Sequence, residues 1–328
     1  MTALPADFRP LTPTRRFTVT SPDGARIAVQ VHEPDRDSDA PTAVLVHGWT
    51  LSATFWVRVV HRIAGLVRTV VYDQRGHGRS SPVPDGGFTP AALADDLAAV
   101  LAATVPDGGA AVVAGHSMGA MAVVAFAGRH ADGLHRQVGT VLLASTGVEQ
   151  LLGRMAVVPS LRRGPAGTPD AGTAGPVRLA VTRQALRDAR PLHRMPLPLA
   201  RATLVHTTMS RTATPQERAY AADLVLACPP RTYEGFARML ADLDLAADLA
   251  RLDVPARVLV GTADRLTPPW HARRMAASLP HPAGLVQVAG AGHLTPLTAP
   301  DAVAAAVLDL ARRDREARPD QWVPRTHG

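Results

Sequence analysis

The segment AVVAGHSMGAMAVVAFAG, which begins at Ala111, places a serine flanked by glycines between two apolar runs. The first run is short and rich in valine, and the second is long enough for a helix. Gly-x-Ser-x-Gly at a strand-to-helix junction forces a sharp turn that lifts the serine hydroxyl clear of the sheet. Gly115 and Gly119 are needed because a Cβ at either position would collide with neighbouring backbone. The segment therefore predicts an α/β sheet with Ser117 at the carboxyl end of a strand.

Apolar runs and helical segments alternate along most of the chain. The later runs are continuous and rich in valine and leucine, as strands of a parallel sheet buried on both faces should be. The first two runs indicate a hairpin. This order predicts an α/β fold, with a mostly parallel twisted sheet flanked by helices and ligand sites at the carboxyl ends of the strands. We expect strands at residues 15–20, 26–32, 42–46, 68–72, 111–114, 139–144, 256–260 and 284–288.

Residues 149–232 interrupt this alternation, because they contain many prolines and no candidate strand. The stretch 164–176 is rich in Gly, Pro and Thr and indicates a loop. A helix is expected where Thr214 and Glu217 form a capping box. We expect an all-helical cap over the carboxyl edge of the sheet, and a polar tail after Arg312 that lies outside the core. The predicted division is 1–148 for the first part of the core, 149–232 for the cap and 233–328 for the second part of the core.

The basic charge of the chain is concentrated in the same middle segment. The formal net charge is +7, and all 35 basic residues are arginines. Between Glu149 and Arg231 there are 12 arginines and 5 acidic residues, so the excess lies there. Nucleic-acid surfaces interleave basic residues with aromatics, but this segment holds only Tyr220. We therefore predict a small-molecule substrate and no nucleic-acid partner.

The sequence also bears on the compartment. No apolar run approaches the roughly 18–20 residues needed to cross a bilayer, so no integral membrane segment is predicted. Arg15 and Arg16 resemble a twin-arginine signal, but an alternating apolar and polar stretch follows them in place of an apolar signal core. The single cysteine, Cys228, cannot form an intrachain disulfide, which fits a reducing compartment. We predict a cytoplasmic protein.

Two later strand ends supply the partners that a reactive serine requires. A serine hydroxyl needs a base, and the base needs a third group to fix its tautomer. Strand 256–260 runs into GTADRLTPP, which contains Asp264, and strand 284–288 runs into AGAGHLTPL, which contains His293. Asp264 could instead be a helix-capping acid near Thr267, and His293 a surface loop histidine. The order Ser, acid, His at successive strand ends favours a catalytic triad.

The strand at 42–46 ends in HGWT, which offers a second donor to an oxyanion. The backbone N–H of Trp49 is expected to face that of Met118, where the helix dipole also favours negative charge. The Trp49 ring is either a core aromatic or part of the pocket wall. His47 is expected to be a structural hydrogen-bonding residue.

These pieces together resemble the α/β-hydrolase superfamily. The matching segments are LVHGWT, VVYDQRGHGRS, VAGHSMGA, LVGTADRLTPP and VAGAGHLTPL, in the order found in the family. The chain is similar to serine-nucleophile, esterase- or lipase-like members that carry a helical cap after the sixth strand. The resemblance implies Ser117 as nucleophile, His293 as base and Asp264 as the acid. It also implies an oxyanion hole formed by the amides of Trp49 and Met118.

The segment DQRGHGRS contains Asp73, Arg75 and His77, and we interpret it as a structural loop in which Asp73 and Arg75 pair. A metal site needs ligands at a fixed spacing, and the histidines near this loop show none. No G-x-G-x-x-G opens a helix here, so a nicotinamide or flavin is not expected. The sequence predicts neither a cofactor nor a metal.

The predicted function is hydrolysis of carboxylic esters, namely small or medium acyl esters or lactones, through an acyl-enzyme intermediate. A carbon–carbon bond hydrolase using the same triad is an alternative, as is a non-catalytic ligand-binding member. Serine at position 117 disfavours the dehalogenases and epoxide hydrolases of the superfamily, which use an aspartate there.

The cap raises a further hypothesis about the substrate. It supplies apolar positions and arginines, and Arg183 or Arg187 could face the pocket and favour an anionic ester or thioester. The alternative is that the arginines form a solvated cap surface. The apolar cap positions are Leu179, Val181, Leu199, Val205 and Met209.

Overall fold

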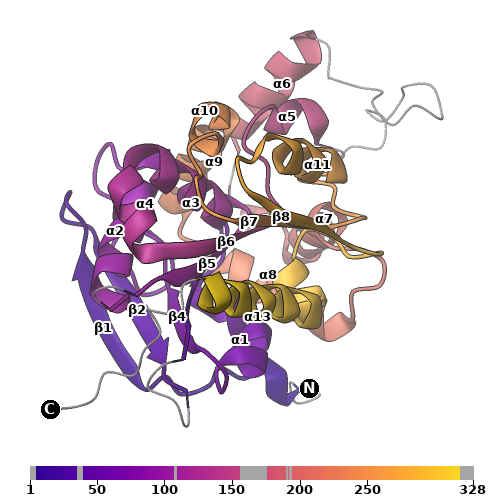
Figure 1. The fold of residues 1–328 in the computed structure, drawn as a ribbon. Coiled ribbons are helices and arrows are strands. Elements are labelled where there is room, and N and C mark those ends of the chain that lie inside the picture. Colours follow the sequence, from indigo (N-terminus) through magenta and orange to yellow (C-terminus); the bar gives the residue numbers. More distant parts are fainter. Residues whose placement is uncertain are drawn as a thin grey trace, which may run out of the picture.

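An eight-stranded sheet runs through the centre of the molecule (Figure 1), in the order β1-β2-β4-β3-β5-β6-β7-β8. The structure is a computed structural model that describes residues 5–34, 40–106, 109–155, 176–189, 191 and 194–317. The strands are β1 (Arg15–Thr20), β2 (Arg26–His32), β3 (Thr42–Val46), β4 (Arg68–Tyr72), β5 (Ala111–His116), β6 (Val138–Ala144), β7 (Ala256–Gly261) and β8 (Pro282–Val288). All eight lie where the sequence predicts them.

The sheet is mixed only at one edge. Strands β1 and β2 form an antiparallel hairpin, and β2 also pairs antiparallel with β4. Every other pairing, from β4–β3 to β7–β8, is parallel. The predicted mostly parallel α/β sheet is therefore confirmed, and the carboxyl ends of β3, β5, β6, β7 and β8 share one edge.

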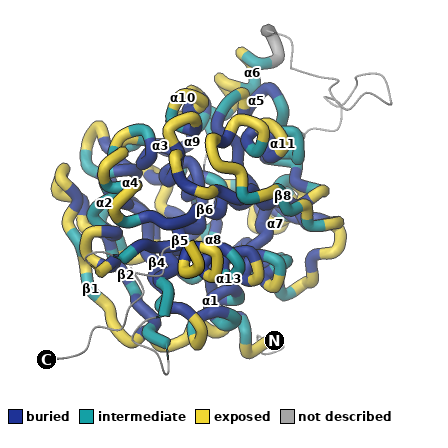
Figure 2. The backbone as a smooth tube through the Cα atoms, in the orientation of Figure 1, coloured by how far each residue is buried: buried dark blue, intermediate teal, exposed yellow. Residues whose placement is uncertain are grey.

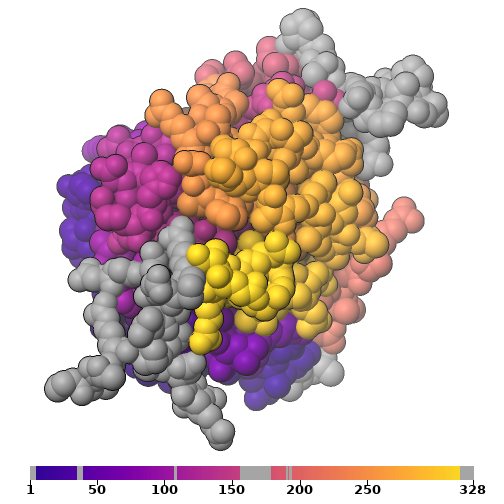
Figure 3. Space-filling model, in the orientation of Figure 1, coloured from indigo at the N-terminus to yellow at the C-terminus, as the bar shows by residue number. Residues whose placement is uncertain are grey.

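Helices cover both faces of the sheet. Their bounds, in chain order, are η1 (Ala6–Phe8), η2 (Ala53–Trp56), α1 (Val57–Ile63), α2 (Pro90–Thr104), α3 (Met118–Arg129), α4 (Ala131–Gln137), α5 (Leu151–Arg154), α6 (Pro176–Arg187), α7 (Leu197–Thr208), α8 (Pro215–Leu226), α9 (Pro230–Ala241), α10 (Ala246–Leu249), α11 (Pro269–Ser278), α12 (Thr295–Thr298) and α13 (Pro300–Ala317). Helices α2 and α3 pack together, and α1 packs against α13. In the space-filling view α13 (yellow) lies beside α1 (purple), so the last described helix packs on an early one at this face (Figure 3).

The alternation of side chains along each strand divides the core into two layers. In β3, Val44 and Val46 belong to the apolar cluster shared with α2 and α3, whereas Ala43 and Leu45 belong to the cluster shared with α1 and α13. Successive side chains of a strand point to opposite faces, so a strand covered on both sides must be apolar throughout. The central strands are accordingly buried, and exposed residues are concentrated on the outer helices and loops (Figure 2).

Between β6 and β7 the described residues form helices and loops and no strand. The predicted capping box is present in α8, where Thr214 Oγ1 accepts the N–H of Glu217 at 3.2 Å and the Glu217 carboxylate accepts the N–H of Thr214 at 2.8 Å. The loop expected at 164–176 lies outside the described residues, except that Pro176 begins α6.

The prediction that the chain leaves the core after Arg312 is contradicted only at Asp314, because the other described residues beyond Arg312 are exposed. Residues 318–328 lie outside the described residues. Helix α13 continues to Ala317, and Asp314 in its last part is buried. A Cβ on Gly139 of β6 would collide with the Asp314 carboxylate, so the glycine makes room for the acid. The polar sequence carries no sign that Asp314 is buried, because the space for it is created by Gly139, a distant strand residue that has no side chain.

Candidate active site

Ser117 stands at the turn between β5 and α3, with φ 52° and ψ −120°. A positive φ is costly for a residue with a Cβ, by about 1–3 kcal/mol, and persists only where the surroundings enforce it. The surroundings are tight: a Cβ on Gly115 would collide with the backbone of Ala120, and one on Gly119 with the carbonyl oxygen of Val46. The turn therefore needs both glycines and holds the serine hydroxyl above the sheet edge.

The three predicted catalytic residues come together at that edge. His293 Nε2 lies 3.1 Å from Ser117 Oγ, and His293 Nδ1 lies 2.9 Å from Asp264 Oδ2. Asp264 follows β7 and His293 follows β8, so loops at neighbouring strand ends carry them. Because Nδ1–H donates to the carboxylate, Nε2 is left with the lone pair that can accept the serine proton.

The Asp264 carboxylate is itself held by the loop that carries it. Its Oδ1 accepts the N–H groups of Leu266 and Thr267, both at 2.9 Å, and its Oδ2 accepts the Thr267 hydroxyl at 2.9 Å. The alternative view of Asp264 as a capping acid near Thr267 is therefore compatible with its place beside His293. The Thr267 hydroxyl was not predicted as part of the site, although it lies three residues from the acid on the same loop.

His116, the residue before the serine, connects the elbow to the histidine loop. Its Nε2–H donates to the carbonyl oxygen of His293 at 3.0 Å. Burial lowers the pKa of the His116 imidazole well below its usual range, so the ring is neutral. Sequence analysis missed this residue, because position x of a Gly-x-Ser-x-Gly motif carries no signal of its partner.

The two predicted oxyanion donors adjoin Ser117. Trp49 lies in the turn after β3, and Met118 is the first residue of α3. Within the described ranges no protein acceptor takes the backbone N–H of either residue. A Cβ on Gly48 would lie 3.1 Å from Ser117 Cβ, so this turn packs directly on the serine. Both amides are therefore available to a ligand at Ser117.

The loop after β4 supports the Trp49 turn. Asp73 accepts the N–H of Ala53 at 2.7 Å, and His77 Nε2 accepts the N–H of Thr50 at 3.2 Å. His47 uses both ring nitrogens, because Nδ1 donates to the Gly48 carbonyl at 2.7 Å and Nε2 accepts the N–H of Gln74 at 2.9 Å. His47 is thus a structural hydrogen-bonding residue, as expected.

The predicted Asp73–Arg75 pair is wrong. Arg75 is fully buried and binds Asp96 of α2 through two hydrogen bonds of 2.7 Å. It also contacts Asp23 at 2.6 Å. Asp73 instead accepts backbone N–H groups, including that of Arg79 at 2.9 Å. The chain turns at Arg75 and Gly76, and the arginine side chain is paired with acids from distant segments instead of with Asp73.

An apolar cavity with two lobes opens around Ser117. The small lobe, of about 70 Å³, is lined by Met121, Leu151, Leu152, Leu240 and Thr267. The large lobe, of about 240 Å³, includes Thr203, Leu204, Thr207, Val225 and Tyr233. Both lobes share the walls formed by Trp49, Ser117, Met155, Leu186, Leu266 and His293. The Trp49 side chain therefore lines the cavity, and its ring lies against that of Tyr233, with centroids 4.6 Å apart.

The residues of segment 149–232 that line the cavity are not those expected from the sequence. None of the five apolar positions named from the sequence lines either lobe, and Val181 and Leu199 are exposed. Arg187 donates to Asp242 at 2.7 Å, and Arg183 lies 3.7 Å from the same carboxylate. Leu186, beside Arg187 in α6, is the side chain that reaches the cavity. The hypothesis of a pocket-facing arginine at 183 or 187 is therefore wrong.

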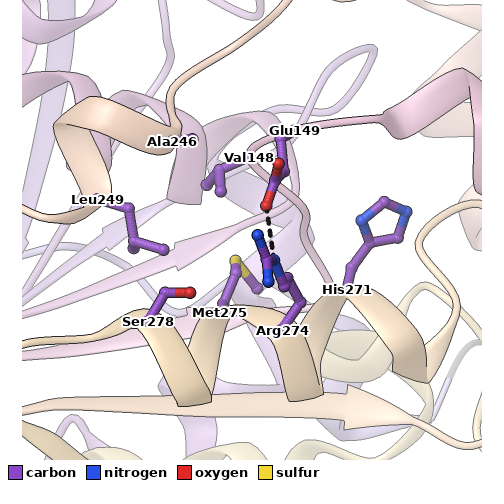
Figure 4. Close-up of a pocket in the computed structure, with 8 residues that line it drawn as sticks. All are labelled: Val148, Glu149, Ala246, Leu249, His271, Arg274, Met275 and Ser278. Carbon is purple, nitrogen blue, oxygen red and sulfur yellow. Dashed lines mark hydrogen bonds and ion pairs between the residues drawn. The ribbon is translucent and has the colours of Figure 1, made fainter.

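A separate hollow of about 210 Å³ lies between α10, α11 and the chain that leaves β6 (Figure 4). Glu149 accepts a hydrogen bond from Arg274 across it at 3.0 Å, and His271 stands at one end. None of its lining residues borders the cavity at Ser117. Nowhere in the described ranges do three or more His, Cys, Asp or Glu side chains form a group that could hold a metal ion.

A serine elbow at the end of a parallel strand, followed by an acid and a histidine at the next strand ends, defines the class of α/β hydrolases. A sequence model of the alpha/beta hydrolase family matches residues 43–306. This chain belongs to that family. Its described helices include none long and apolar enough to cross a membrane.

Individual relatives agree with this membership. A curated protein of Caulobacter sp. strain K31, provisionally named the carbamate hydrolase RutD, is 30% identical over 277 residues, which is 83% of this chain and 91% of that protein. EphD of Mycobacterium tuberculosis, provisionally named an oxidoreductase, is 44% identical over 115 residues, or 35% of this chain. That match spans only 19% of the length of EphD.

Solved structures show the same fold. An esterase from Exiguobacterium antarcticum superposes with a TM-score of 0.73 at 17% identity, covering 91% of this chain and 100% of that one. An esterase from Thermogutta terrifontis superposes with a TM-score of 0.68 at 23% identity, covering 92% of this chain and 99% of that one.

Proposed function

We propose that this protein is a serine hydrolase that cleaves carboxylic esters through an acyl-enzyme intermediate. The observation that carries the proposal is the continuous path from Ser117 Oγ to His293 Nε2, at 3.1 Å, and from His293 Nδ1 to Asp264 Oδ2, at 2.9 Å. A serine is a weak nucleophile at neutral pH unless a positioned base removes its proton. The substrate is a small-molecule ester or lactone.

The reaction has two steps. Ser117 Oγ attacks the carbonyl carbon while His293 Nε2 takes the hydroxyl proton, and the amides of Trp49 and Met118 stabilise the oxyanion. His293 then gives that proton to the leaving alcohol as the ester bond breaks. Water enters, loses a proton to His293 and attacks the acyl-enzyme. His293 then returns that proton to Ser117 Oγ as the acyl–serine bond breaks, which frees the acid and restores Ser117. Asp264 keeps the imidazole in the correct tautomer throughout.

We also propose that residues 149–232 act as a cap between core segments 1–148 and 233–328. The support is the position of Leu186 on α6 and of Thr203 and Leu204 on α7, all of which line the cavity above Ser117. The cap then decides which esters reach the serine. A cytoplasmic setting is part of the proposal, and it rests on Cys228 being free and buried.

The test is a fluorophosphonate probe combined with a panel of p-nitrophenyl esters, applied to the wild type and to Ser117→Ala. We expect the probe to label the wild type and the substitution to abolish labelling. Turnover should fall by a factor on the order of 10⁴–10⁶ in Ser117→Ala. Labelling without turnover of any ester would favour carbon–carbon bond hydrolysis or ligand binding, and no labelling would exclude an activated serine.

A further inference from the structure

The cavity divides at the reacting atoms. Both lobes reach Ser117 and His293, yet one has about 70 Å³ and the other about 240 Å³. An ester bound at Ser117 has an acyl half and an alcohol half that diverge from the carbonyl carbon. When the two lobes begin at that carbon, each lobe takes one half. Both volumes are below the roughly 300–1,000 Å³ typical of drug-sized ligands.

We propose that the site selects neutral carboxylic esters whose two halves differ in size, with the short half in the small lobe and the bulky half in the large lobe. This proposal rests on the proposed function and names its substrate class. It also names Leu240 as a residue that sets the limit on the short half.

The small lobe cannot widen easily. Met121 comes from α3, one turn after the elbow, and is buried, as are Leu151 and Leu152. Protein interiors are close-packed, so moving such side chains disturbs the core around them. Leu240, near the end of α9, also lines this lobe and is only half-buried, so it is the wall residue whose size can be changed with least disturbance of the core. A long or branched half therefore does not fit there.

The large lobe suits a flat apolar group. Trp49 and Tyr233 form an aromatic wall, and Val225 and Leu204 add apolar surface. Two of its threonine hydroxyls are satisfied within α7, because Thr207 donates to the carbonyl oxygen of Thr203 at 2.9 Å and Thr208 donates to that of Leu204 at 2.8 Å. The threonines thus offer methyl groups to a ligand at no cost in lost hydrogen bonds, and aromatic rings pack well on such walls.

The walls also exclude charge. Among the described residues no aspartate, glutamate or arginine side chain borders either lobe. The cap arginines Arg187 and Arg183 contact Asp242 instead of the lobes. A substrate carboxylate that entered either lobe would lose its hydration and gain no charged partner, and that transfer is strongly unfavourable. The site is therefore complementary to a neutral ester.

The test uses four esters made from two acids, acetic and 3-phenylpropanoic, and two alcohols, methanol and benzyl alcohol. Each kcat/KM is divided by the alkaline hydrolysis rate of the same ester, which removes intrinsic reactivity. We expect the kcat/KM of one singly bulky ester to exceed that of the other by about tenfold or more, because a group that does not fit an apolar pocket costs about that much. The doubly bulky ester should fall about tenfold or more below the better singly bulky one. The identity of the better ester assigns the acyl half to its lobe.

Two variants test the walls. Leu240→Ala should raise the normalised kcat/KM of the doubly bulky ester about tenfold relative to that of the better singly bulky ester. Leu240→Val is a milder change in the same direction. Val225→Ala enlarges the large lobe only and should leave that ratio within about twofold. A 4-carboxy derivative of the better ester should react about tenfold more slowly or worse.

Several results would overturn the proposal. The first is a doubly bulky ester whose normalised kcat/KM equals that of the better singly bulky one, and the second is equal values for the two singly bulky esters. The third is a larger change of the ratio in Val225→Ala than in Leu240→Ala. The fourth is a carboxylated ester that reacts as fast as its neutral parent. Fluorophosphonate labelling of the same samples separates the causes. Labelling with a failed size pattern refutes the two-lobe assignment alone, whereas absent labelling refutes the proposed function.

Discussion

His77 Nε2 accepts the backbone N–H of Thr50 at 3.2 Å, one residue beyond Trp49. Thr50 has φ 66°, which is the left-handed region, so this contact holds a turn that the chain would not adopt freely. The second nitrogen of the ring, Nδ1, donates to the Arg75 carbonyl at 3.0 Å, so the imidazole is fixed at both sides. His77 lines neither lobe of the cavity, so it would act on the proposed oxyanion donor only through the turn that carries Trp49.

We expect His77→Phe to lower kcat by a factor on the order of 10–10² and to leave KM nearly unchanged, because an oxyanion donor acts mainly in the transition state. The measurement is steady-state hydrolysis of the best p-nitrophenyl ester, with circular dichroism as a check on folding. His77→Gln keeps an acceptor and should recover part of the rate. A raised KM at constant kcat would show that the loop shapes binding instead.

Thr267 supplies the hydroxyl that binds the Asp264 carboxylate. Thr267→Val removes this hydrogen bond and should lower kcat about tenfold or more, since hydrogen bonds to charged groups contribute about 1.5–3 kcal/mol. Thr267→Ser retains the hydroxyl and should stay within about threefold of the wild type. Equal rates for the valine and serine variants would show that the two backbone N–H groups alone hold the carboxylate.

Two glycines offer a matched pair for the elbow. Gly119→Ala places a methyl group on the Val46 carbonyl, whereas Gly153→Ala in α5 meets nothing within 4 Å. We expect Gly119→Ala to destabilise the fold by about 2 kcal/mol or more and to abolish turnover, since the backbone must shift. Gly153→Ala should be neutral or stabilising by up to about 1 kcal/mol. Urea unfolding of both variants is the measurement, and equal midpoints would contradict the collision.

The strands and the triad positions were predictable because each rests on a local signal. A strand buried on both faces is mostly apolar, and every residue of β3 and β7 is buried, with Thr42 and Arg257 as the polar or charged exceptions. Asp264 lies in the loop after β7, and His293 lies in the loop after the partly exposed edge strand β8, so their approach to Ser117 needed only the rule that parallel strands end at one edge. The local sequence pattern and one rule of sheet topology were therefore sufficient to predict the strands and to bring these residues together.

The rest depended on pairings between distant segments. Arg75 binds Asp96 and Asp23, 21 and 52 residues away, and no pattern in DQRGHGRS marks either acid. The choice of Leu186 over Val181 for the cavity depends on how α6 packs against α9, which helical periodicity alone does not determine. Sequence reasoning therefore located the reacting atoms but not the walls around them.

The buried Arg75–Asp96 pair leads to a stability prediction. Arg75→Leu leaves a carboxylate that is only 1% exposed without its cation, and such a loss costs about 3–5 kcal/mol. Arg129→Leu breaks a comparable contact with Asp95, but the arginine is 51% exposed, so the cost should stay below about 1 kcal/mol. Chemical unfolding of both variants measures the difference. A small effect at Arg75 would show that Asp96 becomes protonated cheaply or finds water.

Three buried histidines predict how stability depends on pH. Burial lowers the pKa of His47 to about 4, of His77 to about 3 and of His271 to about 4. In the unfolded chain a histidine has a pKa of about 6.5, so below that pH the unfolded state binds protons that the native state refuses. Stability is therefore complete above about pH 6.5 and falls as the pH drops toward 4, by up to about 1.4 kcal/mol per pH unit for each histidine.

Urea unfolding at about pH 7, 6 and 5 measures this slope in a range above the usual titration of carboxylates. His77→Gln removes one titrating group and should flatten the slope by about 1.4 kcal/mol per pH unit. His135→Gln, at a side chain that is 54% exposed, is the control and should leave the slope unchanged. A stability that stays constant between pH 7 and 5, or an identical slope in the two variants, would mean that the native state takes up protons at these histidines and that the contact between His77 and Thr50 does not survive in acid.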